Sequence, residues 1–138
     1  MEDAALLRAS ARERALYDEL AGVYRALLDA LADPATPVDP DVVGAHRQRA
    51  EGLVDALRAV AATLAPRRLA GTPVADEVAS LWRASARAAA TALGANRELE
   101  ARVRARGAAI AERLVSVDRG RRALASYRPV AASGSASA

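Results

Sequence analysis

Side chains that carry most catalytic chemistry are scarce in this sequence. Its 138 residues include no Cys and one His, His46. Arg47, Arg49 and Glu51 follow His46 closely, and no carboxylate stands four residues before or after it to orient the ring. A di-iron bundle would need Glu-x-x-His pairs on two helices, and a Walker-type phosphate loop would need clustered glycines and a lysine. Neither pattern is present, so we interpret His46 as a packing or surface residue and predict no enzyme activity, no catalytic residue, no metal site and no cofactor.

Arginine is the other residue type that suggests a binding role. All 20 basic residues are Arg, and residues 97–138 have a net charge of +5, whereas residues 1–65 have −4. One interpretation is that the acidic part partly neutralises the basic part within a bundle; the alternatives are an acidic partner or nucleic acid. The late arginines scatter around a helix at about 100° per residue, and aromatic side chains to stack on bases are missing. We therefore predict a solvated basic surface and no nucleic-acid partner.

The composition favours helices that pack closely. Hydrophobic residues make up 52% of the chain, with Ala dominant, while Phe is absent and aromatic residues reach only 3%. Sheets favour aromatic and β-branched residues in alternation, and the sequence has no sustained alternation. No apolar run approaches the ~18 residues that a membrane span needs, and Met1-Glu2-Asp3 is acidic where a signal peptide would be basic. We therefore predict an all-α cytoplasmic protein without a membrane span.

Two shorter helices are predicted in the first half of the chain. The first covers residues 3–31, and its apolar residues recur at the spacings of three and four that mark a core-facing helix: Leu16, Leu20, Val23, Leu27 and Leu31. The second covers residues 40–65, with Asp39 as N-cap and Pro40 at its first position. Pro66 is expected to end it.

A much longer third helix is predicted over residues 73–127. Thr72 is its expected N-cap and Pro73 its first residue, and at ~1.5 Å per residue it would be roughly 80 Å long. An apolar seam follows it throughout, apart from polar positions such as Asn96 and Arg121. Gly94 and Gly107 each cost up to ~1 kcal/mol relative to Ala in a helix, so bending is expected there.

These elements predict an antiparallel three-helix, coiled-coil-like bundle with a long C-terminal helix, forming one domain over residues 1–128. Residues 129–138 are predicted to be a disordered tail, because Ser, Ala and Gly dominate them. The third helix is about twice the length of either companion, and short connections pair helices only along their common length. The seam beyond about Asn96 is therefore expected to lack a cover and to await a partner.

Two single residues have alternative interpretations. Asn96 lies between Ala92 and Leu99 on the seam, where a buried polar residue would set register or oligomeric state; in an opened bundle it would simply be solvated. Trp82 is predicted to fill the middle of the bundle with Tyr17 and Tyr24, and its alternative role is that of an exposed interface anchor.

The order of helices and one short stretch resemble the FlgN-type flagellar export chaperones. Ala95-Asn96-Arg97-Glu98-Leu99, in the middle of the long last helix, is similar to the Asn-centred stretch of that family. The segment from Val117 to Tyr127 resembles the Gly/Tyr ending near the C-terminus of some members. The helix over residues 3–31 departs from the family because it lacks a strongly Glu-rich, Leu-dense character.

The resemblance implies a non-enzymatic chaperone of protein export. Such chaperones bind the disordered or helical C-terminal segment of flagellar hook-associated proteins and prevent premature self-assembly. The family stretch assigns partner binding to Asn96 and Leu99. The remaining predicted binding residues follow from their place on the seam: Val103, Ile110, Leu114, Val117 and Leu124.

Two other functions compete with this one. In the first, the long helix pairs with its own copy in a structural coiled-coil homodimer. In the second, the basic last helix binds DNA or RNA, which would require a steep dependence of affinity on salt. Self-association predicts a dimer that is lost on Asn96→Ala or Leu114→Asp.

Overall fold

The structure is a computed structural model that describes the backbone of residues 1–136 and the side chains of residues 1–126. It contains three helices: α1 (Asp3–Ala30), α2 (Pro40–Leu69) and α3 (Asp76–Ala136). The described residues contain no strand, which confirms the predicted all-α class. By their contacts they divide into two units, one ending at Arg102 and the other beginning at Val103, with α3 contributing to both.

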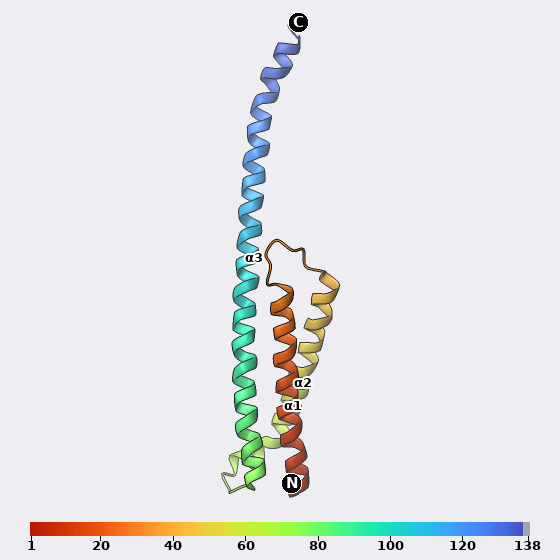
Figure 1. Cartoon of the computed structure of the whole chain (residues 1–138), viewed down its shortest axis with the longest axis vertical. Helices are drawn as coiled ribbons and strands as arrows, with labels where there is room; N and C mark the ends of the chain where they lie inside the picture. Colours follow the sequence, from red (N-terminus) through yellow and green to blue (C-terminus); the bar gives the residue numbers. More distant parts are fainter. Residues whose placement is uncertain (137–138) are drawn as a thin grey trace. The chain divides into compact units, whose positions relative to one another are not determined.

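The first unit is the antiparallel bundle that the sequence predicted. Figure 1 shows α1 and α2 side by side in opposite directions, with the first part of α3 beside them and parallel to α1. All three helices contribute to one buried group, called here the first core cluster: Leu16, Leu20, Val23, Leu27, Ala50, Leu53, Leu57 and Ala92. Four residues of the stripe predicted for the first helix therefore belong to this core cluster: Leu16, Leu20, Val23 and Leu27.

A second core cluster joins α1, the end of α2 and the start of α3. It consists of Leu6, Leu64 and Val78, and Leu64 is fully buried. Trp82 packs against this cluster, whereas Tyr17 and Tyr24 pack against the first one. Trp82 therefore packs inside the bundle, as predicted, but with the second cluster; of the two tyrosines only Tyr17 lines a surface hollow together with it.

The connection between α1 and α2 is ordered by aspartates. The Asp33 carboxylate accepts hydrogen bonds from the Ala35 amide (2.9 Å) and the Thr36 hydroxyl (2.7 Å), as in an Asx turn. The Asp39 side chain accepts from the Asp41 amide at 2.9 Å. Asp39 is thus the N-cap of α2, as predicted.

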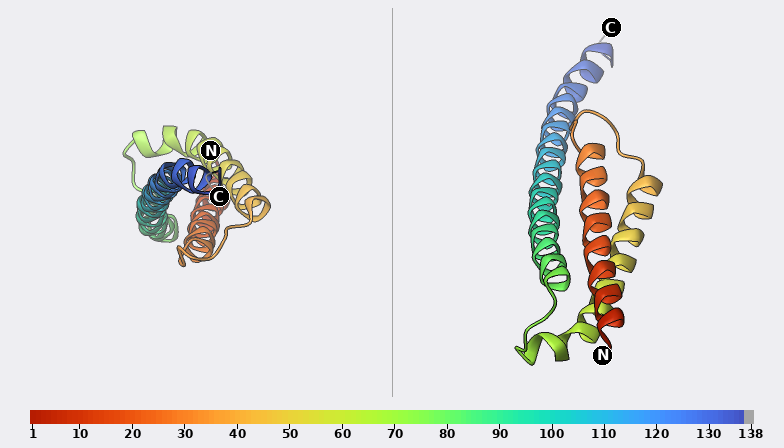
Figure 2. Two further views of the ribbon diagram at one scale, coloured as in Figure 1. Left: turned by 90° about the horizontal axis from the view of Figure 1, so that it is seen from above. Right: turned by 60° about the horizontal axis from the view of Figure 1, so that its bottom comes forward.

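Helix α2 continues past Pro66 to Leu69, contrary to the prediction that proline ends it. Pro66 has no N–H for the carbonyl one turn earlier, but its own carbonyl accepts from the Ala70 amide at 3.1 Å, so the last turn still closes. Figure 2 shows these last turns running across the direction of the earlier part of α2. Gly71, with φ of 66°, then ends the helix in the left-handed conformation that glycine favours.

Helix α3 begins at Asp76, three residues later than the predicted first residue, Pro73. The Arg67 guanidinium donates to the carbonyl oxygens of Thr72 (3.0 Å) and Pro73 (2.8 Å) and also contacts the Thr72 hydroxyl. These bonds fix residues 72–73 in the non-helical segment that precedes α3. The Ala79 amide donates to the Ala75 carbonyl at 3.0 Å, at the start of the helix.

Helix α3 is assigned without interruption through Gly94 and Gly107, the predicted bending points, and ends at Ala136. It thus passes the predicted end at residue 127 and includes residues 129–136, which the sequence assigned to a disordered tail; residues 137–138 lie outside the described part. Within the described residues, no helix combines the length and the apolar character needed to cross a membrane.

Candidate functional site

The predicted binding residues share one face of α3. At about 100° per residue they fall within an arc of roughly 80°, and they comprise Asn96, Leu99, Val103, Ile110, Leu114, Val117 and Leu124. The same arc includes buried residues earlier in α3, among them Val78, Ser85 and Ala92. One helical face therefore serves as core in the first unit and continues into the second.

The structure places these seven residues in two different environments. Asn96 and Leu99 are half-buried in the first unit, and Leu99 packs against the first core cluster. The other five belong to the second unit and are each 52–68% exposed: Val103, Ile110, Leu114, Val117 and Leu124. We call these five residues the distal seam. Only the distal seam, among the predicted residues, presents large apolar side chains to a partner.

Asn96 lies between the two environments. Its amide donates to Glu100 Oε1, one turn further along the same helix, at 3.5 Å. This long bond holds the side chain along α3 and is compatible with a partly solvated position. In this structure Asn96 is therefore not a fully buried seam residue.

Arg102 marks the end of the first unit and links α3 to α1. Its guanidinium donates to the Leu28 carbonyl at 3.1 Å and lies 3.6 Å from the Glu98 carboxylate. Leu28 lies in the last turn of α1, and its carbonyl also accepts from the Leu31 amide at 3.2 Å. Arg102 thus adds a second donor at the end of α1, from the last residue of the bundle.

The residues of the distal seam follow a heptad spacing, and the segment that contains them is rich in arginine. Val103, Ile110, Val117 and Leu124 recur every seven residues, with Leu114 between the middle two, as on one side of a coiled coil. Residues 103–126 contain six Arg and two acidic residues, a net charge of +4. The basic C-terminal third predicted from the sequence thus coincides with the exposed apolar face.

Two positions interrupt the apolar row of the second unit. Gly107 and Arg121 occupy the two remaining seam positions, each seven residues from Leu114. A Cβ atom added at Gly107 would meet nothing within 4 Å, so this position is open. Arg121 is exposed and brings a positive charge into the row. A helix that covers the row therefore meets no side chain at Gly107, near one end, and a positive charge at Arg121, near the other end.

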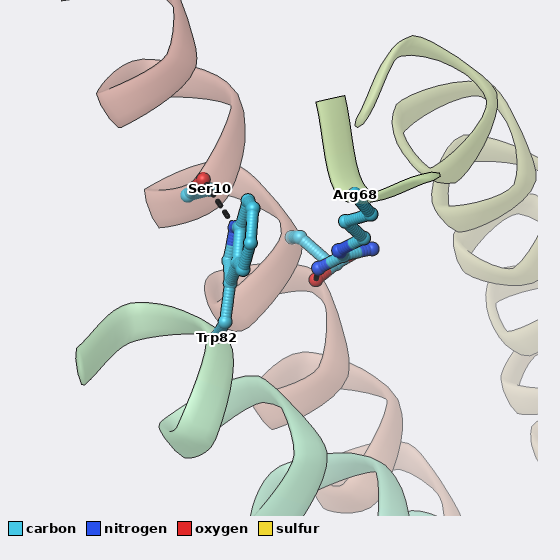
Figure 3. A network of polar contacts seen from close by, with 4 residues as sticks. Ser10, Arg68 and Trp82 are labelled. Carbon is cyan, nitrogen blue, oxygen red and sulfur yellow. Dashed lines mark hydrogen bonds and ion pairs between the residues drawn. The ribbon is translucent and has the colours of Figure 1, made fainter. Parts of the chain in front are cut away.

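Sequence reasoning missed a polar network that joins the three helices. The Trp82 indole N–H donates to Ser10 Oγ at 2.9 Å, and the Arg68 guanidinium lies over the indole ring, 5.0 Å from its centroid. Arg68 also makes two bonds to the Glu13 carboxylate, at 2.5 and 2.9 Å. Figure 3 shows the indole between Ser10 and Arg68.

The burial of this network indicates that it stabilises the fold. We call its four residues the clamp: Ser10, Glu13, Arg68 and Trp82. Glu13 and Ser10 are 3% and 0% exposed, while Arg68 lies nearer the surface. The hydrogen bond to Glu13 raises the pKa of the Arg68 guanidinium, so the guanidinium stays charged. The spacing of Ser10 and Glu13 could have predicted their burial, since they continue the buried stripe of α1 at spacings of three. Both residues are polar, so they were not predicted to belong to the core.

A surface hollow of about 310 Å³ adjoins the clamp and is lined in part by Glu13, Arg68 and Ser85. The Ser85 hydroxyl is buried and has no hydrogen-bond partner among the described residues. The hollow therefore offers one unsatisfied polar atom beside a guanidinium and a carboxylate that already bind each other. It contains no nucleophile–base pair within the described residues that line it.

The chain was compared with protein-family models, with curated proteins and with solved structures, and no match was found. The resemblance to FlgN-type chaperones thus stays a prediction based on a short stretch and the order of helices.

Proposed function

We propose that this protein is a non-enzymatic chaperone-like binding protein that holds an amphipathic helical segment of a protein client against the distal seam. The observation that carries the proposal is the exposure of five large apolar side chains on one face of α3, each by more than half. Helix-in-groove recognition uses anchors at spacings of three, four and seven residues, and the distal seam has this spacing.

Energetics support a partner for this face. Full burial of a Val, Leu or Ile side chain contributes roughly 1.5–3 kcal/mol, and the distal seam forgoes most of that gain in the free protein. Contiguous exposed apolar patches on soluble proteins mark interaction sites. The cost of ordering the client segment offsets part of the gain, which leads us to expect micromolar to submicromolar affinity.

We further propose that the client is a flagellar hook-associated protein and that binding takes place in the cytoplasm. The support is the resemblance of residues 95–99 and of the helix order to FlgN-type chaperones. The test is titration of the full chain with the C-terminal segments of hook-associated proteins encoded in the same genome. Binding of none of them would exclude the flagellar client but not the binding face.

The face itself is tested with two adjacent residues. Leu114 belongs to the distal seam, whereas Val115, similarly exposed, points about 100° away from it. We expect Leu114→Asp to abolish binding of a helical client, measured by fluorescence anisotropy, and Val115→Asp to preserve it. Equal loss in both variants would contradict a seam-specific mode.

Self-association is the second candidate function, because the heptad spacing of the distal seam also suits a coiled coil between two copies. Light scattering across a concentration series distinguishes the two. A stable dimer that becomes a monomer on Leu114→Asp would replace the client hypothesis.

A further inference from the structure

We infer that the segment bound by the distal seam is an acidic amphipathic helix of another protein, with carboxylates that face Arg113 and Arg121. The inference rests on the proposed function and adds to it the charge and pattern of the partner. It follows from the charges around the distal seam and from the two interruptions of its apolar row.

Arg121 makes the first argument. It occupies a seam position between Val117 and Leu124, so any helix that covers those two residues also covers the guanidinium or its stem. Removing a guanidinium from water without a partner is strongly unfavourable. A carboxylate on the covering helix compensates for that loss and can bind the planar group with two hydrogen bonds. A purely apolar or basic helix cannot do so.

Arg113 makes the second argument. It lies at the edge of the seam, about 60–100° from Ile110 and Leu114 around the helix, in the place of a coiled-coil flanking residue. Charges at such positions determine which partner binds. Asp118, the carboxylate closest to the seam within residues 103–126, is paired with Arg122 at 3.0 Å. Residues 103–126 as a whole have a net charge of +4, which attracts an acidic helix over a basic one.

A second copy of this chain fits the same surface poorly. In a parallel pair Arg121 would face its counterpart and Gly107 would face Gly107, which creates one layer of like charges and one empty layer. In an antiparallel pair, two segments of net charge +4 would still oppose each other. Like charges across an interface disfavour association, here between two copies of this chain. The occupant is therefore an acidic helix of another protein.

An anionic membrane surface fits less well than a helix. Helices that lie in a membrane interface have a broad apolar face, commonly with Trp or Phe. The part of α3 beyond Arg102 has no Trp or Phe, and its exposed apolar row over residues 103–126 includes Arg121. A single opposing helix covers such a row completely.

The test uses the full chain and two fluorescent model peptides. Both peptides contain three heptads with the same Leu and Ile core residues. In one peptide the flanking positions and one seam position are Glu. In the other peptide the same positions are Lys. We expect the Glu peptide to bind at least about tenfold more tightly than the Lys peptide, and its affinity to fall as salt increases. Equal affinities would overturn the inference but leave the proposed function intact.

Charge reversal locates the effect on the helix. We expect Arg113→Glu and Arg121→Glu each to weaken binding of the Glu peptide about tenfold, and the double variant to prefer the Lys peptide. Arg119→Glu is the matched control, because Arg119 is equally exposed but lies on the opposite side of α3. If Arg119→Glu weakens binding as much as the seam variants do, the preference reflects only net charge and the inference fails.

Two further outcomes decide against it. If neither peptide binds and light scattering shows a dimer that Leu114→Asp dissociates, both this inference and the proposed function are wrong. If the chain ignores both peptides but sediments with phosphatidylglycerol–phosphatidylcholine vesicles, in a manner abolished by Leu114→Asp, the occupant is a lipid surface and the inference is likewise wrong.

Discussion

The two parts of α3 on either side of Arg102 use the same face for opposite purposes. Before Arg102 this face carries small residues such as Ser85 and Ala92, which are buried against α1 and α2. After Arg102 it carries Ile110, Leu114 and other large residues that are exposed. The large side chains of this face before Arg102, such as Val78 and Leu99, pack in the two core clusters, whereas all five of the distal seam remain exposed.

This difference separates residues that build the core from residues that stay exposed to water in the free chain. Small seam residues let helices approach closely, so the bundle gains its core volume from the leucines of α1 and α2. Large exposed residues give no comparable stability to the free chain, since their apolar area remains in water. Under the proposed function, their regular heptad spacing serves binding of a partner helix.

The largest effect is expected when a buried leucine and an exposed leucine are each replaced by alanine. Leu64 is fully buried in the second core cluster, so Leu64→Ala is expected to lower the free energy of unfolding by about 4 kcal/mol. Leu114→Ala is expected to change it by less than about 0.5 kcal/mol while weakening client binding. Urea unfolding followed by circular dichroism measures both. A similar destabilisation by the two variants would show that the distal seam is part of the core.

The clamp provides the next test, confined to the bundle. Arg68→Ala leaves the buried Glu13 carboxylate without its partner, which is expected to destabilise the protein by about 3 kcal/mol. Arg68→Lys keeps the charge but loses the planar, two-bond geometry, so an intermediate loss is expected. Client binding by the folded fraction should remain unchanged in both variants. A loss of binding without a loss of stability would assign the clamp to the binding site.

A smaller effect is expected from the indole hydrogen bond. Trp82→Phe keeps a ring in the second core cluster but leaves the buried Ser10 hydroxyl without its donor. We expect a loss of about 1–2 kcal/mol in the free energy of unfolding, again without an effect on binding. The double variant with Ser10→Ala should recover part of this loss, and an additive result would show that the bond contributes little.

Periodicity predicted the helices and much of the core, but not the helix ends. The stripe from Leu16 to Leu27 was sufficient to place α1 and its buried face. The end of α2 depends on Gly71, and the segment before α3 depends on Arg67, which binds carbonyls five and six residues later in the chain. Such a contact between a side chain and the backbone has no periodic signature, so Thr72 and Pro66 were assigned from local preference alone.

The sequence predicts where the distal seam lies on α3, because its residues follow a heptad spacing. Their burial was predictable only in part. The half-buried state of Asn96 depends on where the cover from α1 ends, near the bond between Arg102 and Leu28, and no local pattern gives that point. The clamp was missed for a related reason: Glu13 is buried only because Arg68 reaches it from another helix.

The smallest predicted effect tests whether the two parts of α3 respond independently. Gly107 lies within the helix, and a Cβ atom there meets nothing within 4 Å, so Gly107→Ala should stabilise the local helix by up to ~1 kcal/mol. Hydrogen exchange should then slow about fivefold for amides near residue 107, while the urea midpoint of the bundle stays constant. Gly94→Ala, a matched change before Arg102 with equally open surroundings, should instead raise that midpoint. If Gly107→Ala raises the midpoint as much as Gly94→Ala does, the helix beyond Arg102 unfolds together with the bundle and the contrast between the two parts is one of exposure alone.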